Sequence, residues 1–393
     1  MSSWFEQLKN YSNIIDRLDI SQAHYLSLME SVKKVFPQEW VAKELEKHDR
    51  RYPTVIECSL LPGLFRRLVY NPVAIVLGVT CGGFGSLVPL IRLGQLIQAI
   101  EGEASKEQLF QRLRGAQDDY MGALFELEVF EAFKNAGFSL KKAMEADGVD
   151  FTFQKNSKEI LIEATHRGAS WILDLVDEIF RRSFQREFGG QSNRSIRLKL
   201  KYRRDYYTDA AVEEIVKRIV EVGRGFSGGF EDPQGNYSIS QEKSEKHTNL
   251  AIGWNDRGGE CVYEAKDLFK SKLQDKTKLK QLLINPGTYC AIDMRALMPC
   301  ILAEKNNDFF KISSEILRDW LSYACQFFKE NPSVGGIFIW VLHAGRVKDI
   351  IVDHMDQNEI IFVNAPGHLL EEETLQLFPF AKVPGDLSWY HAN

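Results

Sequence analysis

The stretch that most constrains the fold is GVDFTFQKNSKEILIEATH, residues 148–166, which has the pattern of a β-hairpin. Two strand-like runs flank the polar pair Asn156-Ser157, and these residue types favour a tight turn. Asp150 lies near the start of the first run and Glu163 near the end of the second. A carboxylate in such a strand is costly unless it is paired, solvated or bound to a metal. Two acids on neighbouring strands therefore predict a polar site.

The chain as a whole divides into a helical part and a mixed part. Residues 1–115 show apolar residues at three- and four-residue spacing, which predicts an all-helical N-terminal region. Strand and helix patterns alternate over residues 116–393, which predicts an α/β sheet covered by helices. A Gly-, Ser- and charge-rich stretch near 225–248 predicts an exposed insertion.

The patterns in the mixed part define individual elements. Helices are expected at 120–137, 172–188, 207–224, 265–283 and 312–330. Strands are expected at 149–153, 159–165, 194–202, 249–254, 288–294, 335–343, 349–355 and 359–365.

Three motifs resemble the PD-(D/E)XK nuclease superfamily, which includes Holliday-junction resolvases and many restriction endonucleases. A helix glutamate, Glu126, follows Gly122 by four positions; GVDF supplies Asp150, with Val149 where proline is usual; and IEAT supplies Glu163. The resemblance covers about residues 118–166, with a weaker extension to about 295. It implies a restriction-endonuclease-like central mixed sheet flanked by helices. It also implies Mg²⁺ or Mn²⁺ held by Asp150 and Glu163, with Glu126 assisting.

The chain departs from the superfamily pattern where the motif lysine belongs, because Thr165 stands there. Either a lysine reaches the site from another element, or hydrolysis is weak or lost. Lys158 lies near the far end of the hairpin, whereas Lys276 and Lys280 lie on a helix before a buried strand, and we favour Lys280. We expect His166 to be a hydrogen-bonded residue at the strand end, directed to the face opposite Thr165.

A basic stretch bears on the substrate. The run RSIRLKLKY predicts a strand with apolar residues on one face and basic residues on the other. The basic face could follow a phosphate backbone, or it could be a solvated edge strand that lysine protects from aggregation. The candidate nucleic-acid-binding residues are Arg194, Arg197, Lys199, Lys201, Arg203 and Arg204.

Composition narrows the setting. With a net charge of −5, the chain is not a basic nucleic-acid binder as a whole, so such binding must come from a local patch. Six cysteines without a CxxC pair indicate reduced, mostly buried thiols and a cytoplasmic protein. The uncharged stretch Val73–Ile91 contains four glycines, and we interpret it as a buried segment, a loop and a helix start, with no membrane association.

Two functions remain open. The first is a metal-dependent endonuclease that cleaves DNA, with Asp150 and Glu163 as ligands, Glu126 assisting, and a lysine or the Thr165 hydroxyl positioning water. The resemblance implies prokaryotic genome (antiviral) defence as its setting. We also expect the helical N-terminal region to bind a protein partner or to form a homodimer. The second is a catalytically inactive nuclease-like module that binds nucleic acid or scaffolds a partner.

Overall fold

The structure is a computed structural model of the whole chain. The residues that it describes are 20–47, 87–104, 106–115, 117–143, 149–166, 175, 178–179, 182–183, 194–201, 206–225, 228–243, 249–255, 260–294, 309–342, 358–366, 373 and 376–382.

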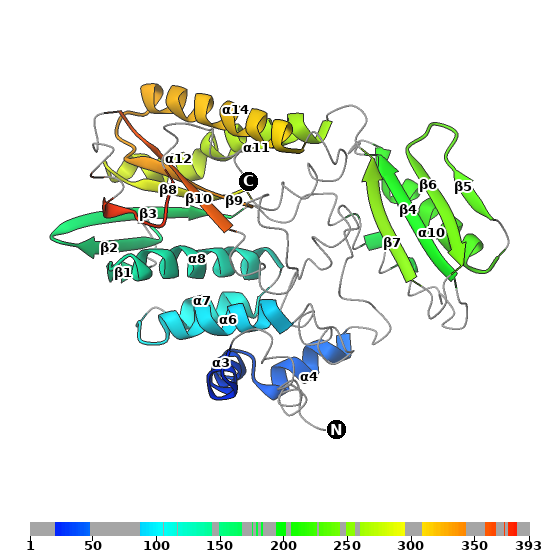
Figure 1. Cartoon of the computed structure of the whole chain (residues 1–393), viewed down its shortest axis with the longest axis horizontal. Helices are drawn as coiled ribbons and strands as arrows, with labels where there is room; N and C mark the ends of the chain where they lie inside the picture. The colour runs from blue at the N-terminus through cyan, green and yellow to red at the C-terminus, as the bar shows by residue number, and fades with distance from the viewer. Residues whose placement is uncertain are drawn as a thin grey trace.

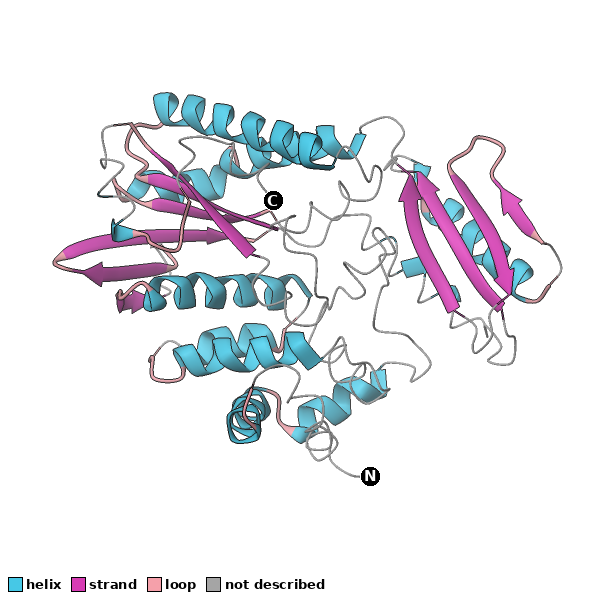
Figure 2. Ribbon diagram, in the orientation of Figure 1, coloured by secondary structure: helices cyan, strands magenta, loops and turns pink. Residues whose placement is uncertain are grey.

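A mixed six-stranded sheet forms the centre of the α/β part, in the order β1-β2-β3-β8-β9-β10 (Figures 1 and 2). The pairs β3–β8 and β8–β9 are parallel, and the other pairs are antiparallel. The strands are β1 (Ser139–Ala143), β2 (Phe151–Lys155), β3 (Lys158–Thr165), β8 (Tyr289–Asp293), β9 (Gly336–Leu342) and β10 (Asn358–Asn364). The predicted α/β class is thus confirmed, while the strand expected at 349–355 lies outside the described residues.

The expected hairpin joins β2 to β3. Lys155 pairs with Lys158, and the two residues between them, Asn156 and Ser157, have φ values of 50° and 64°. Positive φ at both central positions is the geometry of a type I′ turn, whose twist matches that of the flanking strands. This turn fixes the register of β2 against β3, and so decides which residues of the two strands face each other.

Helices cover both faces of the six-stranded sheet. Apolar side chains of α8 (Gln117–Asn135) pack on one face, where Phe153, Ile162 and Phe338 are fully or almost fully buried. The helix ends before Gly137, whose φ of +85° suits the glycine expected after a helix C-terminus. On the other face lie α11 (Glu260–Leu273), α12 (Lys276–Ile284) and α14 (Phe309–Glu330).

The N-terminal helices form further layers outside α8 (Figure 1). Ser21 caps the first of them by accepting a hydrogen bond from the backbone N–H of His24, at 3.2 Å. Their buried side chains belong to the same hydrophobic core as the α8 face of the sheet, so this region is joined to the α/β part. The described helices are α3 (Gln22–Val35), α4 (Gln38–Lys47), α6 (Leu87–Ile100) and α7 (Lys106–Leu113).

Aromatic rings dominate the core between α8 and the sheet. Phe338 on β9 is fully buried, and the centroids of Phe362, Phe378 and Phe133 lie 4.5, 5.0 and 5.5 Å from its own. Pairs of this kind contribute about 0.5–1.5 kcal/mol beyond the burial of their area. The same face carries Phe153, stacked on Phe133 with centroids 4.6 Å apart, so the core helps to hold the hairpin in place.

A second, four-stranded sheet is built from the sequence between β3 and β8, in the order β5-β6-β4-β7. Its strands are β4 (Arg194–Lys201), β5 (Gly229–Glu231), β6 (Tyr237–Lys243) and β7 (Asn249–Asn255). Val212, Ile215 and Ile219 of α10 (Asp209–Gly223) pack on the buried side chains of β4.

The stretch near 225–248, expected to be an exposed insertion, contributes two strands to the four-stranded sheet, and eight of its described residues are exposed. Strands β5 and β6 pair within this stretch, and Asn236, Tyr237 and Ile239 are buried there. The alternation in YSISQ places one residue in two against the core, and this period was hidden by the many polar letters around it.

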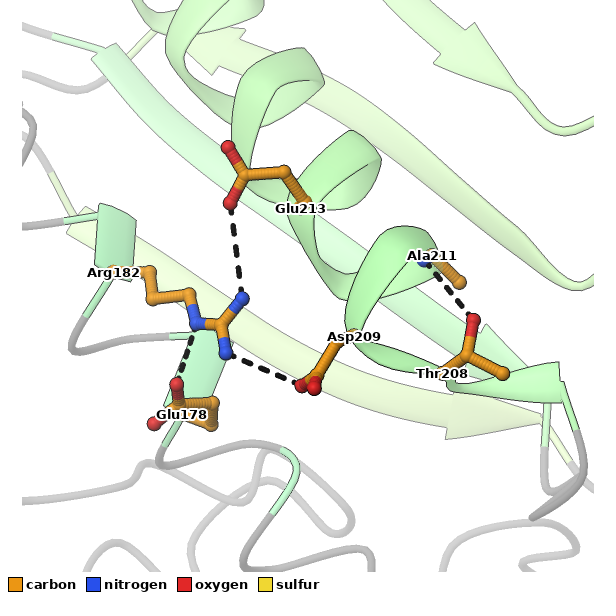
Figure 3. Close-up of polar contacts among 6 residues, drawn as sticks. All are labelled: Glu178, Arg182, Thr208, Asp209, Ala211 and Glu213. Atoms are coloured by element: carbon orange, nitrogen blue, oxygen red, sulfur yellow. Dashed lines mark hydrogen bonds and ion pairs between the residues drawn. The ribbon is translucent and has the colours of Figure 1, made fainter.

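Arg182, which precedes the basic strand β4 in the sequence, forms ion pairs with acidic side chains. Arg182 forms ion pairs with Glu178, Asp209 and Glu213, beside the N-terminus of α10, where Thr208 caps the helix (Figure 3). Arg182 therefore fixes local structure around α10.

The structure also describes part of the uncharged stretch and two of the cysteines. None of the helices in the described part of the chain combines the length and apolar character needed to cross a membrane. Within Val73–Ile91, residues 73–86 lie outside the described residues, and Leu87–Ile91 begin α6 as expected. Cys290 and Cys325 are free thiols; Cys290 is buried, but Cys325 is exposed on α14.

Candidate active site

Asp150 and Glu163 meet at the open end of the hairpin. The β2–β3 ladder ends with Phe151 paired to Ile162, and Asp150 and Glu163 are the next residues along the two segments. Residues opposite each other on antiparallel strands carry their Cβ atoms about 4.5–5.5 Å apart on the same face. The Ala164 backbone N–H donates a hydrogen bond to Oδ2 of Asp150 at 2.7 Å, which ties this carboxylate to β3 beside Glu163.

The two acids differ in exposure. Glu163 is fully buried within the sheet, whereas Asp150 is half-buried just before β2 begins. Both acids lie at the end of the sheet where the parallel strands β3 and β8 finish. The carboxyl ends of parallel strands are where α/β proteins most often bind ligands.

Thr165 follows Glu163 on the same face of β3, as the alternation predicts. It pairs in register with Ile292 of β8, and its side chain is buried. The position of the superfamily lysine therefore holds a neutral hydroxyl, and no charge enters the site from this point of the strand.

Lys280, the candidate for the missing lysine, lies on α12. Its side chain is exposed on α12, and among the described residues it forms no ion pair. Leu282 is buried two positions later, which on a helix of 3.6 residues per turn is nearly the opposite side. The apolar side of α12 faces the core and thereby turns Lys280 to solvent.

Glu126 is buried on α8 and is held by an arginine. Nη1 of Arg112 donates to Oε2 of Glu126 at 2.7 Å, and the side chains are 33% and 7% exposed. Arg112 belongs to α7, in the N-terminal helical region. Glu126 therefore lies on the expected helix, but it is paired with an arginine that precedes the region of the resemblance.

The charge of Arg112 also links Glu126 to Asp150. Burial disfavours the guanidinium, but the hydrogen bond with Glu126 and the charges of Glu126, Asp150 and Asp119 raise the pKa of Arg112 above its ordinary value. Arg112 is therefore a permanent positive charge placed among three carboxylates.

Gly122 makes room for this arginine. A Cβ atom at position 122 would lie 2.9 Å from Nη2 of Arg112. The glycine that helped to define the motif thus has a physical role, because any larger residue would force the guanidinium to shift.

His166 and Asp293 form a buried pair at the ends of β3 and β8. Nδ1 of His166 lies 3.1 Å from Oδ2 of Asp293, and their side chains are 5% and 4% exposed. The ring of Phe125 on α8 lies 6.3 Å from the imidazole, on the face opposite Thr165. The expected hydrogen-bonded histidine is confirmed. Nε2 is buried and has no hydrogen-bond partner among the described residues.

Two other glutamates of α8, Glu128 and Glu131, are not simply solvated. Glu131 pairs with Arg92 of α6 through both carboxylate oxygens, as a paired surface charge would. Glu128 is buried rather than solvated. The glutamates of α8 therefore lie on more than one side of the helix: Glu126 contacts α7 and Glu131 contacts α6.

The basic strand lies in the four-stranded sheet, apart from the one that carries the acids. Ile196, Leu198 and Leu200 are fully buried, whereas Arg197 and Lys199 are exposed, so the predicted alternation is confirmed. The edge-strand interpretation is wrong, because β4 is hydrogen-bonded to β6 on one side and to β7 on the other.

The remaining basic candidates stand as follows. Lys201 ends β4 and is half-buried, and Arg194 begins the strand, with its side chain outside the described residues. Arg203 and Arg204 also lie outside the described residues.

The donor set for a metal consists of the two strand acids. Among the residues that the structure describes, no three His, Cys, Asp or Glu side chains converge closely enough to hold an ion. Glu126 therefore does not complete a three-ligand cluster with Asp150 and Glu163. Mg²⁺ usually binds one or two carboxylates, keeps several waters and completes its shell with substrate phosphate, so two acids fit this ion.

The chain was compared with protein-family models, curated proteins and solved structures. No protein-family model, no curated protein and no solved structure matches this chain.

Arg112 is the site residue that sequence reasoning missed. It lies before the matched region, in the short run KEQLFQRL, and nothing in its spacing distinguishes it from other arginines of amphipathic helices. The one available signal was Gly122, a glycine inside a helix, which indicates close approach of another group.

Proposed function

We propose that the chain is a metal-dependent endonuclease with a restriction-endonuclease-like fold, which cleaves phosphodiester bonds of DNA. The observation that carries the proposal is the hydrogen bond from the Ala164 N–H to Asp150, which brings this carboxylate next to Glu163, at the end of a mixed sheet where parallel strands finish. Two carboxylates at that edge are costly for folding alone, and they suit a hard divalent cation.

The chemistry would be divided between the ion and the chain. When bound by Asp150 and Glu163, Mg²⁺ or Mn²⁺ supplies a Lewis acid for the phosphate and lowers the pKa of a bound water. The Ala164 N–H orients the Asp150 carboxylate. Thr165 has a hydroxyl that can orient water but cannot supply the positive charge of a lysine.

DNA would be held by charge outside the carboxylate site. The exposed Arg197 and Lys199 lie two positions apart on β4, about 6.8 Å, on the sheet face opposite α10. Binding through such residues is expected to weaken as salt rises. Restriction of foreign DNA, in the cytoplasm, is the setting that we propose.

The second candidate is an inactive nuclease-like module that binds nucleic acid or scaffolds a protein partner or a second copy. Two observations favour it: the lysine position holds the buried Thr165, and Glu126 is engaged with Arg112.

Plasmid cleavage separates the two candidates. The full chain is incubated with supercoiled DNA in Mg²⁺ and then Mn²⁺, beside Asp150→Asn and Glu163→Gln, which keep the shape of each side chain. Glu159→Gln, on the same strand but paired at the exposed end with Lys141, is the matched control. Metal-dependent nicking lost in the first two variants and kept in the control supports the endonuclease. Salt-sensitive DNA binding without nicking in any metal supports the inactive module.

A further inference from the structure

Arg112 has binding capacity beyond its pair with Glu126. A guanidinium has five N–H donors in a rigid plane, and one of them is used at 2.7 Å. A third of the side chain is exposed, and Nη2 packs closely against Gly122. Glu126 and Gly122 thus hold the guanidinium in one orientation, with part of the side chain open to solvent.

We propose that Arg112 binds a phosphate of the nucleic acid next to the Asp150–Glu163 pair, and so supplies the positive charge that β3 lacks at Thr165. This inference rests on the proposed function, because it takes Asp150 as part of the substrate site. It makes the N-terminal helices part of the site, since α7 contributes the phosphate-binding residue.

The chemistry of arginine decides what this residue does. A guanidinium is always charged in proteins, so Arg112 cannot take a proton from water. It can bind two phosphate oxygens through parallel N–H groups, which a lysine ammonium cannot do. Arg112 therefore orients phosphate and stabilises its charge, and activation of water is left to the metal.

The surrounding acids set a condition on this binding. Asp119, Glu126 and Asp150 all act on Arg112, so the local charge without metal is negative and repels a phosphate. A divalent cation at Asp150 and Glu163 reverses that balance. Phosphate binding by Arg112 is therefore expected only when the metal is present.

A purely structural role would resemble that of Arg92. This residue, on α6, pairs with Glu131 of α8, and the side chains are 27% and 16% exposed. Both arginines thus join an N-terminal helix to α8 through a glutamate, but Arg112 pairs with Glu126, the glutamate of the motif, and its charge also acts on Asp150. Arg92→Gln is therefore the matched control for Arg112→Gln.

The test measures DNA binding and needs no cleavage. Binding of a short fluorescent duplex to the full chain is followed by anisotropy across a range of NaCl, with Ca²⁺ and with EDTA. In Ca²⁺, Arg112→Gln should weaken binding about tenfold and reduce the slope of log K against log[salt] by about 0.9, the value for one lost phosphate contact. Arg92→Gln should leave the slope unchanged, and in EDTA the two variants should behave alike.

Two further variants separate charge from geometry. Arg112→Lys should keep the salt slope but bind less tightly, because it loses the bidentate contact. Gly122→Ala should weaken binding while every charge is retained. Thermal unfolding of each variant shows whether it is folded.

Equal salt slopes for Arg112→Gln and Arg92→Gln in Ca²⁺ would overturn the inference. If the wild type cleaves DNA and those slopes are equal, the proposed function stands and the role of Arg112 fails. If the wild type neither binds nor cleaves DNA, both fail together.

Discussion

Replacing Glu163 by glutamine should make the metal-free protein more stable while it abolishes metal-dependent cleavage. The reason lies in the end of the hairpin, where the hydrogen bond from Ala164 to Asp150 brings that carboxylate next to the fully buried Glu163. When both carboxylates are ionised, their charges repel each other and one of them is held away from water. Glutamine keeps the size of the side chain and removes the charge.

The expected gain follows from the geometry. At a separation of about 5 Å and an effective dielectric constant of about 20, two unit charges repel by about 3 kcal/mol. Asp150 is half-buried and accepts a hydrogen bond from Ala164, so solvent and the backbone dipole absorb part of this repulsion. We therefore expect Glu163→Gln to gain about 1–2 kcal/mol in the free energy of unfolding.

Urea unfolding in EDTA and in Mg²⁺ measures both halves of this prediction. In EDTA, Glu163→Gln should have the higher midpoint, and Glu159→Gln should stay within about 0.5 kcal/mol of the wild type, as expected for an exposed pair. A hundredfold excess of Mg²⁺ over its Kd should stabilise the wild type by about 2.7 kcal/mol and leave Glu163→Gln unchanged. A Glu163→Gln protein that is less stable than the wild type in EDTA would refute the reasoning.

Three further predictions concern stability. Ser157→Gly should raise the free energy of unfolding by about 0.5–1 kcal/mol, because glycine adopts the positive φ of the hairpin turn without strain, whereas Ser157→Ala should not; urea unfolding checks both. Phe338→Ala should cost about 3–5 kcal/mol in the same assay, because it empties the centre of the aromatic core, and a loss below 1 kcal/mol would contradict the packing described. Burial raises the pKa of Tyr289 to about 12. The unfolded chain therefore loses this proton first, and stability that is complete below about pH 10 is lost as the pH rises toward 12. In Tyr289→Phe, the fall in the free energy of unfolding between about pH 10 and 12 should be smaller by about 2 kcal/mol, as measured by urea unfolding at several pH values. An unchanged pH dependence would exclude Tyr289 as the cause.

The hairpin could be predicted from sequence because its signals are local. Asn156-Ser157 marks the turn, and the turn fixes the register that pairs Phe151 with Ile162, the neighbours of Asp150 and Glu163. The face of His166 and the alternation of β4 follow from the same period of two residues.

The misses have a common cause, which is contact between distant segments. Arg112 reaches Glu126 only because α7 packs on α8, and no residue near either one indicates this packing. Likewise, an edge strand was one of the two interpretations of the basic residues of β4, but β6 and β7 come from further along the chain and pair on both sides of it. The exposure of Lys280 could not be predicted either, because it depends on which side of α12 meets the sheet.

The pairing of β3 with β8 has a consequence for how the chain acquires its structure. Ile162 pairs with Tyr289, so residues 166–288, including the whole four-stranded sheet, are synthesised before this ladder can form. Closing so long a loop costs conformational entropy before the parallel contacts can stabilise it, and strand pairings of this kind form slowly. The hairpin edge of β3 therefore waits unpaired during synthesis, with Glu163 still in contact with water. The buried acid is enclosed only late, when β8 arrives, so the polar end of the sheet is among the last parts of the molecule to be assembled.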